Sequence, residues 1–355
     1  MEKKTLREIG ERLKWERENR YDIVVSTEEL KTSVDVGTGT IRMDVPQPDG
    51  EFKHHGITGF AHGQIANKTG IPKKYYDKMI EDGKPDLLAT NINAWLPQKD
   101  KRLVRVLGND VRALLSDRYR VIDNHDVLYT SLEEINNVQE KLGFNIDIER
   151  ADVTETRLYM KAISKDLTDD IMYKPTESSP VYGGIIITNS EVGCGAFKVE
   201  PYMHVQVCSN GMVSDMSLRR IHVGREKDAG IINWSDVTRE LEDRALWSKI
   251  RDMIQQTFDP EIFHKWVDEI NGVAQIEIAK PTLAIDNVIK RFDLPKGRKD
   301  DLLDQFAKES PNMWGLSMAV TRVAQDLENY DQQVEWEKVG SKILETPPKV
   351  FEREI

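Results

Sequence analysis

The spacing of apolar and polar positions changes several times along the chain. The first twenty residues place apolar side chains at roughly helical spacing among acids and bases, which predicts an amphipathic helix. Residues 26–51 are rich in Thr, Val, Asp, Gly and Pro, so we expect short strands or a loop there. Residues 63–81 return to helical spacing, with one break at Gly70-Ile71-Pro72.

Period-two alternation begins after residue 97. The segment RLVRVLGNDVRALLS alternates on both sides of Gly108-Asn109-Asp110, which predicts a β-hairpin. The segments RLYMKAI (157–163) and FKVEPYMHVQVC (197–208) also alternate and predict two further strands, with an apolar run over 181–187 between them. Pro201 lacks an amide hydrogen, so the later strand should run at a sheet edge or through a bulge.

Helical signals surround these strands. Asp123-Asn124-His125-Asp126 offers oxygens that can cap a helix through Ile135. Residues 234–344 read as helices that break at four prolines. We therefore predict an α+β fold with a central antiparallel sheet, flanking helices and a helical C-terminal region. The expected units are an N-terminal helix and strand arm (1–55), a helix-turn-helix-like segment (56–96), the sheet domain (97–233) and the helical region (234–355).

Composition places the chain among globular proteins. It has 355 residues, of which 39% are apolar and 31% charged, and a net charge of −11. No stretch reaches the ~20 apolar residues of a membrane span, and the charged N-terminus does not resemble a secretory signal. The two cysteines, Cys194 and Cys208, are too few for a disulfide framework. We expect free thiols and a cytoplasmic location.

Familiar enzyme machinery is absent from the sequence. There is no phosphate loop, no zinc-protease helix, no serine-nucleophile elbow and no paired-cysteine motif, so we predict neither an enzyme nor a cofactor. Cys194, His204, Cys208 and His222 are metal-ligand types, but their spacing matches no ligand pattern and we predict no metal. Asp117, Asp123 and His125 are close in sequence, although a helix cap explains Asp123 more simply.

One segment has the residue spacing of a helix-turn-helix. In GQIANKTGIPKKYYDKMI a small residue would let two helices approach, and a glycine would make the turn. Lys73, Lys74 and Lys78 would lie on the second helix, where they could contact phosphates. The alternative is an ordinary helical hairpin whose lysines are simply solvated.

A second signal is a possible basic and aromatic face on the sheet. Cations and rings alternate against apolar partners, and a face of this kind suits single-stranded nucleic acid because cations bind phosphates and rings stack on bases. The alternative is a solvated face. The candidate residues are Arg105, Arg112, Arg118, Tyr119, Arg120, Arg157, Tyr159, Lys161, Lys198, Tyr202, His204, Arg219 and Arg220, with Lys99, Lys101, Arg102, Arg225 and Lys227 in adjoining clusters.

Net charge opposes nucleic-acid binding, because an acidic protein repels a polyanion at long range. The acids are concentrated, however, toward the C-terminus. Residues 236–355 contain 24 acids and 17 bases, which gives −7 of the total −11, whereas residues 97–122 contain seven bases and three acids. A molecule with a basic middle and an acidic C-terminal region is consistent with these counts.

Four segments together carry a family resemblance. They are GIPKKYYDKMIEDGKPDLLATNINAWL, VRALLSDRYRVIDNHDVL, TNSEVGCGAFKVEPYMHVQVCSNGMV and MWGLSMAVTRVAQD. In that order, over residues 56–344, the chain resembles the phage- and plasmid-borne family catalogued as domain of unknown function 932. The resemblance implies a role in mobile-element replication, recombination or conflict with the host. The sheet region is also similar, by architecture alone, to Rad52-like annealing proteins.

Three functions remain open at this level. The leading hypothesis is a homo-oligomeric protein that binds single-stranded DNA non-specifically and assists annealing, recombination or replication. The second is a duplex-binding regulator that uses the helix-turn-helix-like segment. The third is an interaction protein that counters a host factor and contacts it through the acidic helical region.

Overall fold

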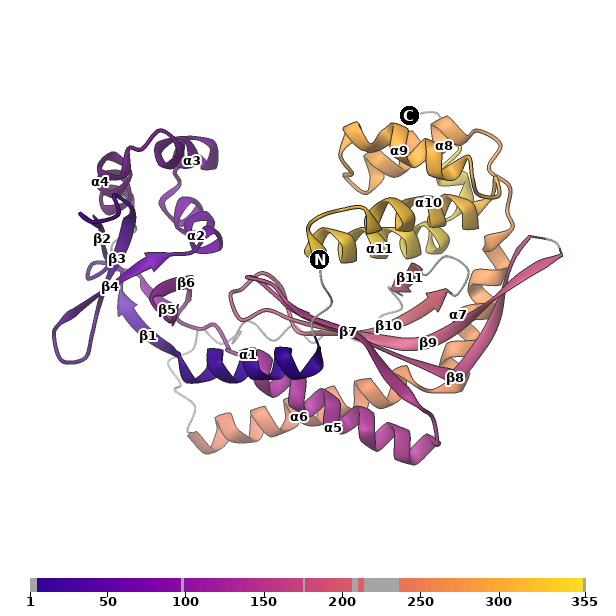
Figure 1. Ribbon diagram of the computed structural model, residues 1–355, viewed down its shortest axis with the longest axis horizontal. Coiled ribbons are helices and arrows are strands. Elements are labelled where there is room, and N and C mark those ends of the chain that lie inside the picture. The colour runs from indigo at the N-terminus through magenta and orange to yellow at the C-terminus, as the bar shows by residue number, and fades with distance from the viewer. Residues whose placement is uncertain (1–4, 97–98, 175, 206–209, 214–235, 354–355) are drawn as a thin grey trace.

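The computed structural model describes residues 5–96, 99–174, 176–205, 210–213 and 236–353. Two β-sheets form the framework, and helices pack against both of them (Figure 1). The predicted α+β class and the helical C-terminal region are therefore confirmed. No helix within the described residues is long and apolar enough to cross a membrane.

The first sheet is mixed and has six strands in the order β1-β5-β6-β4-β3-β2. Its strands are β1 (Arg20–Ser26), β2 (Lys31–Val34), β3 (Ile41–Pro46), β4 (Phe52–Ile57), β5 (Lys101–Leu107) and β6 (Asp110–Ser116). All neighbours are antiparallel except β4 and β6, which run parallel. The predicted hairpin forms β5 and β6, but it pairs with strands of the N-terminal segment, not with the later strands that we grouped with it.

Helices α2 (Gly59–Thr69), α3 (Lys73–Glu81) and α4 (Pro85–Trp95) cover this sheet. Helix α1 (Leu6–Glu18) precedes it, begins with a capping box at Thr5 and packs instead against α5 and β7. Apolar side chains of α2, α3 and α4 form one core with the inward side chains of β3, β5 and β6. The opposite side of β5 and β6 faces a loop from the second sheet, where a smaller cluster includes Leu103, Ala113 and Val192.

The second sheet is antiparallel, with the order β11-β10-β9-β8-β7. It follows α5 (Asn124–Leu142) and consists of β7 (Ile146–Val153), β8 (Leu158–Lys174), β9 (Glu177–Asn189), β10 (Lys198–Val205) and β11 (Asn210–Val213). The described pairing between β10 and β11 runs from Tyr202 to Val205, and Pro201 pairs with Ile185 of β9 on the other side. The residue that follows β11 lies outside the described residues, so the predicted edge at Pro201 stays a prediction.

The C-terminal region consists of helices separated where the sequence predicted breaks. They are α6 (Asp236–Thr257), α7 (Pro260–Ala274), α8 (Pro281–Arg291), η1 (Lys296–Arg298), α9 (Lys299–Phe306), α10 (Met313–Gln325), α11 (Tyr330–Glu345) and η2 (Pro348–Val350). Proline occupies the first turn of α7 and of α8, where its missing amide costs nothing. Asp259, Asn312 and Asn329 cap α7, α10 and α11 through their side chains.

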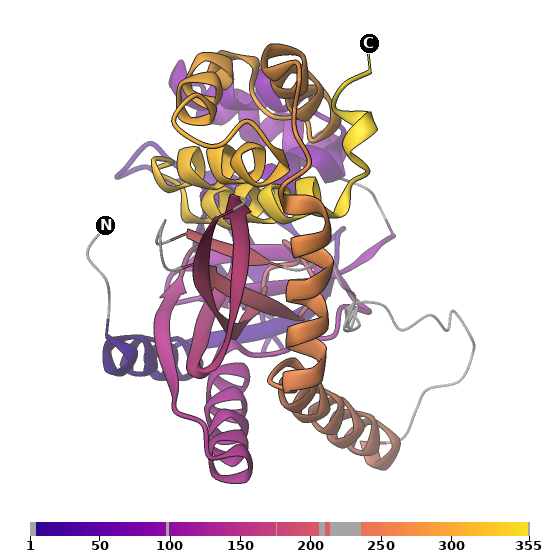
Figure 2. The same ribbon diagram turned by 90° about the vertical axis from the view of Figure 1, so that its right-hand side faces the viewer.

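Helices cover both faces of the second sheet (Figure 2). The helices α5 and α6 lie on one side, α10 and α11 lie on the other, and α7 runs beside β8. The C-terminal region therefore folds back over the sheet, which the period-two pattern of the strands could not reveal. This arrangement decides the environment of nearly every predicted site residue.

Candidate functional site

Five predicted binding residues share one face of the second sheet. The strand register aligns Tyr159 on β8 with Lys198 on β10 across β9, and Lys161, Tyr202 and His204 continue the same face. The prediction that this face is exposed is wrong, because α11 covers it. Tyr159, Lys161 and Tyr202 are only 1%, 6% and 3% exposed, and Lys198 and His204 are partly buried.

Charged groups of α11 pair with charged groups of this face. Lys161 Nζ lies 2.6 Å from Glu337 Oε2 and 5.0 Å from the centre of the Tyr202 ring. Burial lowers the pKa of Lys161, but the charge of Glu337 and its other neighbours outweigh burial, so the pKa is raised and the amine stays charged. A second ion pair has the opposite polarity: Lys338 Nζ on α11 lies 2.9 Å from Glu200 Oε2 on β10. The face is therefore cationic and aromatic, as predicted, but its cations have internal partners.

Arg105 and Arg112 belong to the other sheet and are buried, which corrects their assignment to the same exposed face. Strand β1 places Asp22 directly opposite Arg105, and Asp22 Oδ1 accepts from Arg105 Nε at 2.8 Å. A β-bulge between β5 and β6 leaves Arg112 without a cross-strand partner. An extra residue of this kind re-aims its side chain, and here Arg112 joins Arg105 beside the loop that follows β9.

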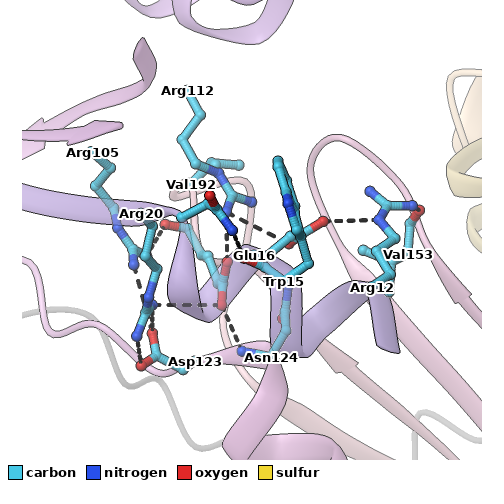
Figure 3. Close-up of polar contacts among 12 residues, drawn as sticks. Arg12, Trp15, Glu16, Arg20, Arg105, Arg112, Asp123, Asn124, Val153 and Val192 are labelled. Carbon is cyan, nitrogen blue, oxygen red and sulfur yellow. Dashed lines mark hydrogen bonds and ion pairs between the residues drawn. The ribbon is translucent and has the colours of Figure 1, made fainter. Parts of the chain in front are cut away.

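That loop, residues 190–195, accepts the two guanidinium groups (Figure 3). Arg112 Nη1 donates to Glu191 Oε2 at 2.8 Å, and Arg105 Nη1 donates to the Glu191 carbonyl oxygen at 2.6 Å. The other carboxylate oxygen of Glu191 accepts from the amide of Asn124, the first residue of α5, at 2.7 Å. Glu191 thus joins both sheets and the start of α5 through one buried side chain.

The cap prediction for Asp123 also needs correction. Asp123 does precede α5, but its side chain makes no capping hydrogen bond. Both of its carboxylate oxygens accept from Arg20, and Arg105 Nη2 lies 3.6 Å away. Burial would raise the pKa of Asp123, but Arg20 and then Arg105 bring it below its usual value. The side chain serves this ion network, and Glu191 takes the capping role.

The triplet Arg118-Tyr119-Arg120 follows β6. Arg118 is exposed, whereas Tyr119 and Arg120 are partly buried. Tyr119 Oη donates to the carbonyl oxygen of Ser190 at 2.8 Å, which ties the triplet to the loop. Of the adjoining clusters, Lys101 is exposed and Arg102 pairs with Asp100 at the start of β5. Arg219, Arg220, Arg225 and Lys227 lie outside the described residues.

The helix-turn-helix-like segment forms α2 and α3. Gly70 ends α2 with φ 70°, in the left-handed region that glycine adopts without strain. Lys73, Lys74 and Lys78 are exposed, and Lys73 pairs with Asp77 one turn later. The two helices are confirmed, and a DNA-reading role for α3 stays a prediction.

A groove opens between α11 and the loop that follows β9. We call it the Arg157 groove, because Arg157 lines both its main cavity of about 510 Å³ and a narrow extension. Arg157 and Arg298 line the main cavity, and Lys198 and Lys338 line the extension beside Arg157. These four cationic side chains come from the turn before β8, from η1, from β10 and from α11. The remaining polar and aromatic walls include Tyr159, Asn189, Ser190, Cys194, Asp331, Gln332, Glu335 and Trp336.

Arg157 is fixed in place at the centre of this groove. Its Nε and Nη2 donate to the Cys194 carbonyl oxygen at 3.2 and 2.8 Å, and its Nη1 donates to Tyr159 Oη at 3.1 Å. Glu335 Oε1 lies 3.4 Å from the same Nη1. The guanidinium is therefore pre-positioned, although one neighbouring carboxylate already shares its charge.

The described residues contain no group of three or more His, Cys, Asp or Glu side chains placed to hold a metal ion. Cys194 is a free, partly buried cysteine on the groove wall. Cys208 and His222, which the sequence suggested as possible co-ligands, lie outside the part of the chain that the structure describes.

Sequence reasoning missed the acidic partners. Asp331, Glu335 and Glu337 lie in the acidic stretch DLENYDQQVEWE, which reads as a solvated helix. Glu337 is 176 residues from Lys161, and Glu191 is 79 residues from Arg112. The available signal was a surplus of arginine and lysine at strand positions, which requires anions from elsewhere in the chain.

Comparisons with protein-family models, with curated proteins and with solved structures find no match. Membership in the family of domain of unknown function 932 therefore stays a prediction from the sequence.

Proposed function

We propose that this protein binds single-stranded nucleic acid in the Arg157 groove, and that it acts as a binding protein in the cytoplasm and not as an enzyme. The observation that carries the proposal is the convergence of four cationic side chains from separate elements on one groove. Such a site attracts phosphates, and arginine can bind them through two parallel hydrogen bonds.

The size and lining of the groove favour a single strand. Its cavity of about 510 Å³ falls within the range of ligand pockets, ~300–1,000 Å³. A base of a single strand can enter such a pocket, whereas a base in a duplex is held in its stack. Trp336 supplies part of the aromatic wall, and Gln332 and Asp331 supply groups that can bond a base edge.

The test is fluorescence anisotropy with a labelled oligothymidine strand and a matching duplex, titrated over a range of salt. We expect single-strand preference, with log K falling as salt rises by about 0.7 per phosphate contact. Arg298→Ala should weaken binding several-fold and reduce the slope by about 0.7. Arg322→Ala is the matched control, because Arg322 is an exposed arginine of α10 outside the groove lining.

Failure of both nucleic acids to bind at low salt would overturn the proposal and favour a host-protein partner. Equal losses from Arg298→Ala and Arg322→Ala would overturn the assignment to the groove. The annealing or recombination role and the homo-oligomer that the sequence suggested are further parts of this proposal. Strand-annealing kinetics and light scattering test them directly.

A second candidate function rests on α3. Its three lysines are exposed, so they are available to phosphates of a duplex. A joint Lys73→Ala and Lys74→Ala variant should abolish duplex binding if α3 is the reading element, and should leave oligothymidine binding unchanged if the groove is the site.

A further inference from the structure

We propose that the sheet face beneath α11 is a second single-strand binding surface, and that α11 occupies it in this structure as an acidic substitute for the strand. The inference rests on the proposed function of the Arg157 groove and extends it. Nucleic acid that enters the groove would displace α11 from the sheet and take over its contacts with β8 and β10.

The contacts between α11 and the sheet are mainly polar. Carboxylates of α11 meet cations or hydroxyls of the sheet: Glu337 meets Lys161 at 2.6 Å, Glu335 meets Arg157 at 3.4 Å, and Asp331 accepts from Thr156 Oγ1 at 2.7 Å. Three anions along one helix thus stand where phosphates of a strand could stand. Phosphate oxygens can replace carboxylate oxygens on lysine and arginine without leaving either cation unpaired. Glu200 would lose Lys338 in the same step, and Lys198, whose Nζ lies 4.0 Å from Glu200 Oε1, is the cation that stays beside it.

Apolar packing beneath α11 is limited. Two small clusters occupy this layer, one of Tyr159, Tyr330 and Val334 and one of Ile163, Ile186 and Tyr202. The larger apolar side chains of α11, including Trp336, Val339 and Ile343, belong to the main core, which contains residues of α10 and of the second sheet. Helices α10 and α11 pack against each other, so the two helices can move as one unit. Interfaces of this polar kind permit relative movement.

The aromatic side chains indicate what the surface would bind. Tyr330 of α11 packs edge-on against Tyr159 with ring centres 5.0 Å apart, and the Arg150 guanidinium lies 3.7 Å from the centre of the Tyr330 ring. Tyr330 is 3% exposed, yet its hydroxyl has no hydrogen-bond partner among the described residues. Burying a hydroxyl without a hydrogen-bond partner costs free energy, so the contact of Tyr330 with the sheet carries a penalty when α11 is in place. A base could stack at the same place without that cost.

The covered face continues directly from the groove. Tyr159 and Lys198 line the groove extension, and the strand register places Lys161 and Tyr202 farther along the same face. A strand held by Arg157 would therefore reach Lys161 only after α11 moves. The groove is the entry and the covered face is its extension.

The test compares oligothymidine binding by the unaltered protein and by two variants that weaken the contacts between α11 and the sheet. Glu337→Gln removes the partner of Lys161. Glu335→Gln removes a carboxylate whose side chain is 53% exposed, so that variant should keep its fold. Both should bind about tenfold tighter than the unaltered protein, with a salt slope steeper by about 0.7 for each added phosphate contact. Asp304→Asn, on the exposed surface of α9, is the charge-matched control and should change neither quantity.

A second measurement follows the position of α11 itself. Hydrogen exchange of the unaltered protein should show α11 amides losing protection when oligothymidine binds, while α5 amides keep theirs. Unchanged affinity in both variants, or increased protection of α11, would overturn the inference and leave groove binding intact. Absence of binding by every form would overturn the proposed function itself.

Discussion

The buried pair of Lys161 and Glu337 gives the sharpest stability prediction. The two side chains are 8% and 11% exposed, and Lys161 Nζ lies 2.6 Å from Glu337 Oε2. Replacing either partner by methionine leaves the other charge in a nearly dry site, and such losses typically cost about 3–5 kcal/mol. Replacing both removes the pair and its desolvation cost together, so the double variant should be within about 1 kcal/mol of the original stability.

The size of each single loss has an upper bound. A stranded side chain can always change its protonation state, and the cost of doing so at pH 7 limits the destabilisation. For a glutamic acid this cost is about 3.7 kcal/mol, and for a lysine about 4.6 kcal/mol, at 1.36 kcal/mol per pH unit from their reference values. Lys161→Met should therefore cost no more than about 4 kcal/mol through its stranded carboxylate. Glu337→Met should cost slightly less than the lysine limit of about 4.6 kcal/mol, because the Tyr202 ring still faces the charged Lys161 amine.

Guanidinium unfolding at pH 7, followed by circular dichroism and tryptophan fluorescence, measures all four proteins of this double-mutant cycle. The expected coupling energy is about 5 kcal/mol or more, because two large single losses nearly vanish together. Single losses below about 1 kcal/mol that add in the double variant would refute the reasoning, since they would show a solvated pair of the ordinary surface kind.

Two further predictions concern other parts of the molecule. His62 accepts from or donates to Tyr76 Oη at 2.7 Å, and burial lowers its pKa from 6.5 to about 4. The unfolded chain therefore binds more protons between those values, so the free energy of unfolding should fall as pH drops from about 6.5 to 4, by at most about 3.4 kcal/mol. His62→Gln should remove this part of a thermal-unfolding pH profile, and an unchanged profile would show that the imidazole is solvated. An added Cβ at Gly184 would lie 2.2 Å from a backbone carbonyl oxygen of β8, whereas one at Gly297 would meet open space. Gly184→Ala should lower the free energy of unfolding by about 3 kcal/mol in guanidinium titrations, and Gly297→Ala should not; equal effects would contradict the close approach.

Local periodicity was sufficient to predict several elements, although neither β7 nor α4 was predicted. The hairpin of β5 and β6, the proline-separated helices after residue 259 and the shared face of Tyr159, Lys161 and Tyr202 all follow from spacing within short windows. These features depend on side-chain direction, which the backbone period sets.

Local periodicity could not predict what covers an element. Apolar and polar residues alternate in the same way along a strand face that meets water and along one that meets a charged helix. The sequence therefore predicted an exposed Lys161, although α11 covers it. The bulge at Arg112 likewise changes one side chain's direction without an obvious local signature. The ion partners of Arg105 and Asp123 lie far away in sequence, and no window includes them.

The loop that follows β9 has a consequence for how the chain is made. The ribosome completes β5 and β6 long before it adds Glu191, which comes 86 residues after Arg105 and 79 after Arg112. At about 5–20 residues per second, about 4–16 seconds pass between the synthesis of Arg112 and the synthesis of Glu191. During that time Asp22 and Glu16 are already present beside Arg105 and Arg112, but the first sheet lacks Glu191 and the loop that covers β5 and β6. We therefore expect the first sheet to acquire its final stability late in synthesis, only when the loop arrives.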